Sequence, residues 1–218
     1  MSWIRTKLEA FADRVAGHEA GEIYLYSDFL KLLDRASNNL PFGEKQVIEV
    51  SCHTTIESLA SLLALAQSRH IALPLPTELT KIEREEMRKV ASDSSIYEKL
   101  ESSGLILFSS GTSKKPKGML HNFEILVNRY RDIKMRKDRC LQLLLFDHIG
   151  GLDTAFRCLF AGSTLVVPDQ RTPEAVGLAI ESKKVNILPA SPTFFNLLLL
   201  AKIPEKYDLE SVKILAYG

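Results

Sequence analysis

Short apolar runs alternate with helical segments along most of this chain, and this alternation limits the possible folds more than any other feature. The runs that predict buried strands lie at residues 46–52, 71–75, 105–108, 141–146, 164–167, 185–188 and 212–217. Near-continuous apolar strands that are joined by helices are typical of a parallel sheet buried on both faces. The sequence therefore predicts an α/β fold, a mostly parallel sheet covered by helices on both faces.

Several of the predicted helices begin with capping residues. A Ser or Thr side chain ahead of a helix accepts a hydrogen bond from an early amide, and Pro is favoured at the first helical position. The capping boxes are Thr54-x-x-Glu57 and Thr80-x-x-Glu83, and the cap-plus-proline starts are Thr172-Pro173 and Ser191-Pro192.

Apolar residues one turn apart from Trp3 to Val15 predict an amphipathic N-terminal helix. The helix up to about Ser92 is so charged that we expect most of it to be solvated.

The composition is that of an ordinary globular protein. Of the 218 residues, 45% are hydrophobic and 25% charged, and the net charge of +1 gives no reason to expect nucleic acid or an acidic membrane as partner. The three cysteines are distant from one another and odd in number, which predicts reduced thiols in a cytoplasmic protein and no metal site. No apolar run is long enough to span a bilayer. We expect two α/β subdomains, residues 1–103 and 104–218.

The segment 105–121, LILFSSGTSKKPKGMLH, combines an apolar run with a hydroxyl-rich, basic loop. We expect a strand at 105–108, then the loop, then a helix from about Leu120. A strand that feeds a loop opening a helix can bind phosphate through backbone amides and the positive helix end. The loop is not a Walker A motif, because Pro116 precedes Lys117 and Gly118 follows it. From the residues alone, a site for an anion such as a nucleoside triphosphate and a polar surface turn fit equally well.

The loop resembles the signature loop of the adenylate-forming superfamily, which comprises acyl- and aryl-CoA ligases, adenylation domains and luciferases. The family pattern is approximately Thr-Ser-Gly-Thr-Thr-Gly-x-Pro-Lys-Gly. The matching positions are Ser109, Ser110, Gly111, Thr112, Ser113, Pro116, Lys117 and Gly118, two of them by Thr/Ser exchange. Lys114 departs from the pattern, because the family usually has a glycine there. The resemblance implies that these residues, apart from Pro116, bind the ATP phosphates, and that Lys117 is also catalytic.

A second candidate segment, residues 146–152 with the sequence FDHIGGL, follows the carboxyl end of a predicted strand. Doubly wound sheets place their ligands at such ends. The segment resembles the family pattern Phe-His-x-Gly-Gly-Leu, which implies that His148 lines the carboxylate site and takes part in catalysis. Asp147 departs from that pattern. Without the resemblance, the segment also fits a glycine turn with an exposed histidine, and less well an acid–base or metal site of Asp147 and His148.

The resemblance extends over most of the chain and implies a function. Members of the family join a carboxylate to the α-phosphate of Mg-ATP and then pass the acyl group to a thiol of CoA or a carrier protein. The family's adenine loop, magnesium-binding glutamate, ribose-binding aspartate and C-terminal lysine have no counterpart in this sequence. We therefore expect a truncated N-terminal portion of such an enzyme, inactive alone, with its Mg²⁺ ligands elsewhere. The alternative is a non-catalytic module of the same fold, used for binding or assembly.

The expected partners follow from the same interpretation. The first is a small-molecule carboxylate. The second is another copy of the chain, or another protein, which would pair with the open sheet edge at strand 212–217. We expect no nucleic acid and no membrane span.

Overall fold

The fold is known from a computed structural model that describes residues 2–93, 95, 97–109 and 116–217. The strands are β1 Val15–Glu19, β2 Glu22–Leu25, β3 Val47–Ser51, β4 Ile71–Leu75, β5 Gly104–Ser109, β6 Lys117–Asn122, β7 Arg139–Leu141, β8 Thr164–Val166, β9 Ile187–Pro189 and β10 Ile214–Ala216. The helices are α1 Ser2–Glu9, α2 Tyr26–Asn38, α3 Ile56–Ala66, α4 Lys81–Ala91, α5 Phe123–Asn128, α6 Ile149–Phe160, α7 Pro173–Lys183, α8 Pro192–Leu200 and α9 Ile203–Lys206.

The strands of the described residues form two sheets. One has the order β10-β9-β7-β8-β1-β2 and the other the order β3-β4-β5-β6. Pairing is parallel except between β1 and β2 and between β5 and β6, which are antiparallel. The prediction of a mostly parallel α/β fold is therefore confirmed, with the strands divided between two sheets.

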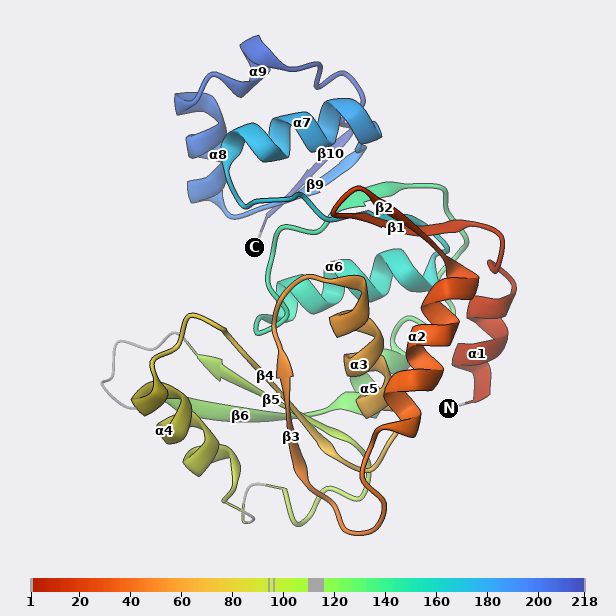
Figure 1. The fold of residues 1–218 in the computed structure, drawn as a ribbon, viewed down its shortest axis with the longest axis vertical. Helices are drawn as coiled ribbons and strands as arrows, with labels where there is room; N and C mark the ends of the chain where they lie inside the picture. Colours follow the sequence, from red (N-terminus) through yellow and green to blue (C-terminus); the bar gives the residue numbers. More distant parts are fainter. Residues whose placement is uncertain (1, 94, 96, 110–115, 218) are drawn as a thin grey trace.

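Helices lie between the two sheets and on their outer faces (Figure 1). The inner helices α3, α5 and α6 share one large apolar core with residues from both sheets, among them Leu105 and Leu165. On the outer faces, α4 packs over β4 and β5, whereas α7 and α8 pack over β7 and β9. The central strands of each sheet are thus covered on both faces, as their apolar residues require, whereas the edge strands β2 and β10 are partly exposed.

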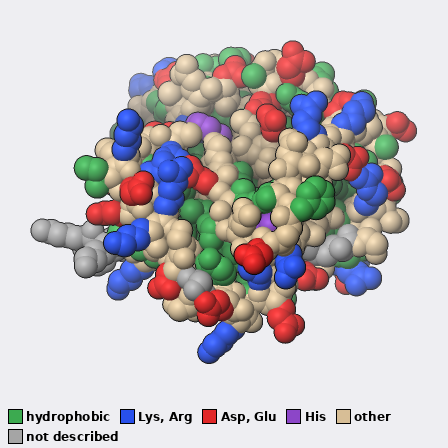
Figure 2. Space-filling view, turned by 60° about the horizontal axis from the view of Figure 1, so that its bottom comes forward, with side chains coloured by type: hydrophobic (Ala, Val, Ile, Leu, Met, Phe, Trp, Pro, Cys, Tyr) green, Lys and Arg blue, Asp and Glu red, His purple; other side chains and the backbone are tan. Residues whose placement is uncertain are grey.

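The strands β1 and β2, although early in the chain, belong to the same sheet as β7 to β10. Both halves of the chain therefore build that sheet, and the predicted division at residues 103/104 stays a prediction about subdomains. Charges of both signs are interspersed over the face seen in Figure 2, without a large area of one sign. Among the helices of the described residues, none is long and apolar enough to cross a membrane.

Some of the predicted helix starts and ends are wrong, and others are confirmed. Helix α1 ends at Glu9, because Val15 pairs with Leu25 in the β1–β2 hairpin instead of continuing the helix. The cap of α3 is Thr55, one residue later than predicted, and its hydroxyl accepts from the Ser58 amide. The capping box Thr80-x-x-Glu83 is confirmed at the start of α4. The caps Thr172 and Ser191 are confirmed as well, and each of these two is followed by a proline in the first turn of its helix.

Tyr26 connects α2 to the end of α6 and to the turn before β8 through hydrogen bonds. Its side chain is fully buried, and its hydroxyl lies 2.9 Å from the Leu159 carbonyl oxygen and 2.7 Å from that of Ser163. Burial raises the pKa of Tyr26 well above its usual value, so the hydroxyl stays protonated and can donate. It connects segments more than a hundred residues apart in the sequence.

We expect Tyr26→Phe to lower the free energy of unfolding by about 1–2 kcal/mol, because two buried carbonyls lose a shared donor. Urea denaturation measures the change. Tyr24→Phe, on the partly exposed strand β2, is the control and should stay within about 0.5 kcal/mol of the wild type. Equal effects of the two substitutions would contradict this role for Tyr26.

Candidate active site

The carboxyl ends of the parallel strands meet where the two sheets approach each other. Strands β3, β4 and β5 run parallel, so they end at the same edge of their sheet. At this edge the amide of Phe146, in the loop after β7, donates to the Cys52 carbonyl oxygen after β3 at 3.2 Å. This bond brings the end of β7, in the other sheet, to the end of β3.

The predicted phosphate-binding loop begins at this edge, but its centre lies outside the described residues. Ser110, Gly111, Thr112 and Ser113 belong to that undescribed part. Ser109 ends β5, and Lys117 opens β6 opposite it. The assignment of all these residues to phosphate binding stays a prediction.

The prediction of a helix from about Leu120 is wrong, because residues 117–122 form strand β6, antiparallel to β5. Helix α5 begins only after Asn122, which is paired with Gly104 at the opposite end of the hairpin. No α5 dipole therefore points at the loop. Any anion bound there would depend on loop amides, hydroxyls and the Lys117 ammonium.

The register of the hairpin decides which way Lys117 points. Directly opposed residues share a face of a sheet, and alternate residues along a strand share it too. Met119 is opposite Leu107, whose side chain lies in the core between the sheets, so Lys117 is on that inner face as well. Gly118 lies on the outer face, where an added Cβ would come within 3.2 Å of Ile106.

Asp147 and His148 lie in the loop between β7 and α6. The His148 side chain is 60% exposed at the start of α6, whereas that of Asp147 is only 15% exposed. The buried Oδ1 atom of Asp147 has no hydrogen-bond partner, and His148 Nε2 lies 3.7 Å from it. Burial raises the pKa of the Asp147 carboxyl, opposed by the positive charges of His148 and Arg171.

The first turn of α6 lies directly on the backbone of this loop. At Gly151 an added Cβ would lie 2.0 Å from the Leu145 carbonyl oxygen, which no side chain tolerates. At Gly150 it would lie 3.4 Å from a Leu144 methyl group, an ordinary contact. Only the second glycine of the pair is therefore required by packing.

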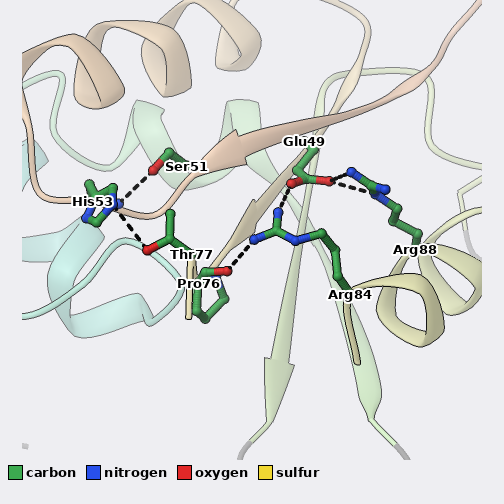
Figure 3. A network of polar contacts seen from close by, with 7 residues as sticks. All are labelled: Glu49, Ser51, His53, Pro76, Thr77, Arg84 and Arg88. Carbon is green, nitrogen blue, oxygen red and sulfur yellow. Dashed lines mark hydrogen bonds and ion pairs between the residues drawn. The ribbon is translucent and has the colours of Figure 1, made fainter. Parts of the chain in front are cut away.

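The end of β4 is held by two polar contacts that the sequence did not reveal (Figure 3). Arg84 of α4 donates to the Pro76 carbonyl oxygen at 2.8 Å and also bonds Glu49 of β3. On the other side, His53 Nε2 lies 3.2 Å from the Thr77 hydroxyl. The prediction that most of α4 is solvated missed Arg84, since nothing in a run of charges tells which of them turns towards a strand.

The groups at this edge can bind an anion next to a carboxylate and an imidazole. Among the described residues, no group of three His, Cys, Asp or Glu side chains is placed to hold a metal ion. Lys117 opens β6, which lies three strands from β3 in the order β3-β4-β5-β6. The Asp147–His148 loop, which follows β7 of the other sheet, adjoins the end of β3 through the bond from Phe146 to Cys52. With neighbouring strands about 4.8 Å apart, the three spacings between β3 and β6 add up to roughly 14 Å, which suits a ligand of nucleotide size.

Comparisons of sequence give relatives of one kind. The sequence model of the family described as AMP-binding enzyme matches residues 93–218. The 4-coumarate--CoA ligase-like 9 protein of Arabidopsis thaliana is 34% identical over 122 residues, which are 52% of this chain and 22% of that protein. Gramicidin S synthase 2 of Brevibacillus brevis is 24% identical over 177 residues, 75% of this chain and 4% of that protein. The chain thus spans less than a quarter of either relative.

Solved structures share the fold. The O-succinylbenzoate coenzyme A synthetase of Bacillus subtilis, in complex with AMP, aligns with 99% of this chain and 67% of its own, with a TM-score of 0.73 and 20% identity. The N-terminal subdomain of NpsA from Klebsiella oxytoca aligns with 99% of this chain and 64% of its own, with a TM-score of 0.81 and 17% identity.

The described strands and helices define an α/β protein with the fold of these solved structures. The chain belongs to the AMP-binding enzyme family, because the family model matches more than half of its residues.

We expect Gly151→Ala to lower the free energy of unfolding by at least about 2 kcal/mol, because the methyl group collides with backbone atoms that cannot move aside alone. Gly150→Ala is the matched control. It should be neutral or stabilise the protein by up to about 1 kcal/mol, since alanine favours a helix over glycine. Chemical denaturation of the two variants measures the difference, and similar values for both would refute the packing argument.

Burial of the Asp147 carboxyl, only partly offset by the charges of His148 and Arg171, predicts a pH-dependent stability. Because burial raises its pKa in the folded state, this group stabilises the fold below the ordinary Asp pKa of about 4, and that contribution is lost as the pH rises through the folded-state pKa. Asp147→Asn should therefore raise the thermal unfolding midpoint at neutral pH and leave it unchanged at about pH 3. A lower midpoint for Asp147→Asn at neutral pH would show instead that the attraction of the carboxylate to His148 and Arg171 outweighs the cost of its burial.

Proposed function

We propose that this protein activates a carboxylic acid with ATP. A carboxylate oxygen attacks the α-phosphorus, and the bond from that phosphorus to the bridging oxygen of the β-phosphate breaks. The products are an acyl-adenylate and pyrophosphate. In the second step a thiol, of CoA or a carrier protein, takes the acyl group and AMP is released. Membership of the AMP-binding enzyme family supports the proposal. So do the B. subtilis synthetase structures, one with AMP and one with the acyl-adenylate OSB-AMP.

We assign the β- and γ-phosphates of ATP to the segment from Ser109 to Gly118, with Lys117 as the charged donor. The departing pyrophosphate gathers negative charge, and fixed donors that stabilise such charge often contribute more to catalysis than any other effect. The observation that carries this assignment is the register of the β5–β6 hairpin. It puts Lys117 at the carboxyl edge of the sheet and on the inner face, the face towards α6 and the Asp147–His148 loop.

We assign the substrate carboxylate to the neighbourhood of His148. Its exposed imidazole stands at the start of α6, where the helix dipole favours negative charge. Mg²⁺ would accompany the nucleotide, because this ion is usually held by one or two carboxylates together with substrate phosphates. Among the described residues we name no ligand for it.

The proposal is tested in the full-length protein, by titration with ATP in a calorimeter and by ATP–pyrophosphate exchange with a panel of carboxylic acids. We expect Lys117→Ala to weaken ATP binding or slow exchange about ten- to a hundredfold, since a charge-assisted hydrogen bond contributes about 1.5–3 kcal/mol. Lys31→Ala, on the exposed surface of α2, is the matched control and should change neither quantity.

Equal ATP affinity and exchange rate in the wild type and Lys117→Ala would remove Lys117 from the site. Failure of the full-length wild-type protein to bind ATP at all would contradict the proposed function and favour the non-catalytic module instead.

A further inference from the structure

Gln142 is a polar residue in an otherwise apolar run. The residues from Leu141 to Phe146 are all apolar except this one. Its backbone amide extends the pairing of β7 with β8 by donating to the Val166 carbonyl oxygen at 2.8 Å. The whole residue is only 1% exposed, so its side-chain amide lies in the core.

The two hydrogens of this amide are donated to the two ends of the Asp147–His148 loop. The Nε2 atom lies 2.7 Å from the Leu144 carbonyl oxygen and 3.2 Å from that of Gly151. Leu144 precedes Asp147 and His148 in the chain, and Gly151 follows them in the first turn of α6. One side chain therefore fixes the distance between the strand side and the helix side of the loop.

The backbone bonds of the loop lie mainly on its helix side, where the Gly151 and Leu152 amides donate to the His148 carbonyl oxygen at 3.1 and 3.3 Å. Its strand side is held less well. The bond from the His148 amide to the Leu145 carbonyl oxygen is long, at 3.4 Å, and weak bonds of this length hold a turn poorly. Phe146 is bonded across to Cys52 at 3.2 Å. The Gln142 amide thus supplies bonds that the loop backbone does not.

The Gln142 side chain is a costly choice for a core position. Its Oε1 atom is buried and has no hydrogen-bond partner, and such an atom destabilises a fold. An apolar side chain of similar length would fill the same space without that cost. Packing alone therefore does not account for a glutamine here, whereas its two donated hydrogen bonds do.

We propose that Gln142 is a positioning residue, which sets where Asp147 and His148 stand relative to the substrate site. This inference rests on the proposed function for its consequence in catalysis, but the geometry it concerns exists without any ligand. Gln142 itself does not touch the reacting atoms. It acts through the backbone carbonyls of Leu144 and Gly151.

The first test uses Gln142→Met, which keeps the length of the side chain and removes both donors. We expect the amides of Phe146 and His148 to exchange with solvent at least about tenfold faster, since two buried hydrogen bonds are lost. Released from its buried position, the Asp147 carboxyl should titrate closer to an ordinary aspartate in ¹³C NMR spectra. Gln67→Met is the matched control, because it removes an amide-to-carbonyl bond at the end of α3, where Nε2 lies 3.3 Å from the Leu63 oxygen.

The control should leave both signals of the Asp147–His148 loop unchanged. Unchanged exchange and an unchanged Asp147 titration in a folded Gln142→Met variant would overturn the proposal. These readouts need neither ATP nor substrate, so a failure of the proposed function would not affect them. Where pyrophosphate exchange is measurable, kcat should fall at least about tenfold with little change in the KM for ATP.

Gln142→Glu covers the case in which the methionine variant does not fold. In this variant an ionised carboxylate carries no hydrogen for either carbonyl, whereas the protonated form donates one bond. Burial raises the pKa of such a group, so we expect amide protection of the loop to recover as the pH is lowered from about 8 to about 5. Loop protection that does not vary with pH, or failure of both variants to fold, would make Gln142 a purely structural residue and end the proposal.

Discussion

The packing of two sheets against one shared layer of helices is the constraint on which the rest of this protein depends. Residues of α3, α5 and α6 form a single apolar core with strands of both sheets. Because the sheets are fixed through this layer, the ends of β3 and β7 approach closely enough for a backbone bond from Phe146 to Cys52. The candidate active site is the place where this junction reaches the surface.

Much of the fold could be predicted from the sequence because its signals are local. The apolar runs of β4 and β5 and the caps Thr80, Thr172 and Ser191 carry their physical cause within a few residues. The division of the strands between two sheets has no such signal. It depends on β1 and β2 joining β8 from far away in the chain, and only tertiary packing decides that.

The candidate site shows the same limit in sharper form. Recognisable residues predicted where the loops are, but not how they are supported. The sequence predicted a helix from about Leu120. Residues 117–122 instead pair with β5 over the full length of β6, because the edge of a sheet offers more hydrogen bonds than an isolated turn of helix. The supporting residues Gln142, Arg84 and Glu49 were missed. Gln142 and Arg84 act through backbone carbonyl groups, which carry no mark in the sequence, and Arg84 pairs with Glu49 from another element of the chain.

The hairpin of β5 and β6 also limits how far a change in the segment between its two strands can affect the fold. The pairing of Ser109 with Lys117 keeps the two ends of the intervening segment next to each other whether or not anything is bound. The entropy lost by bringing chain ends together rises only slowly with the length of the segment between them. Insertions or deletions between these anchors should therefore have little effect on the sheet beneath, so the length of this segment can change without loss of the fold.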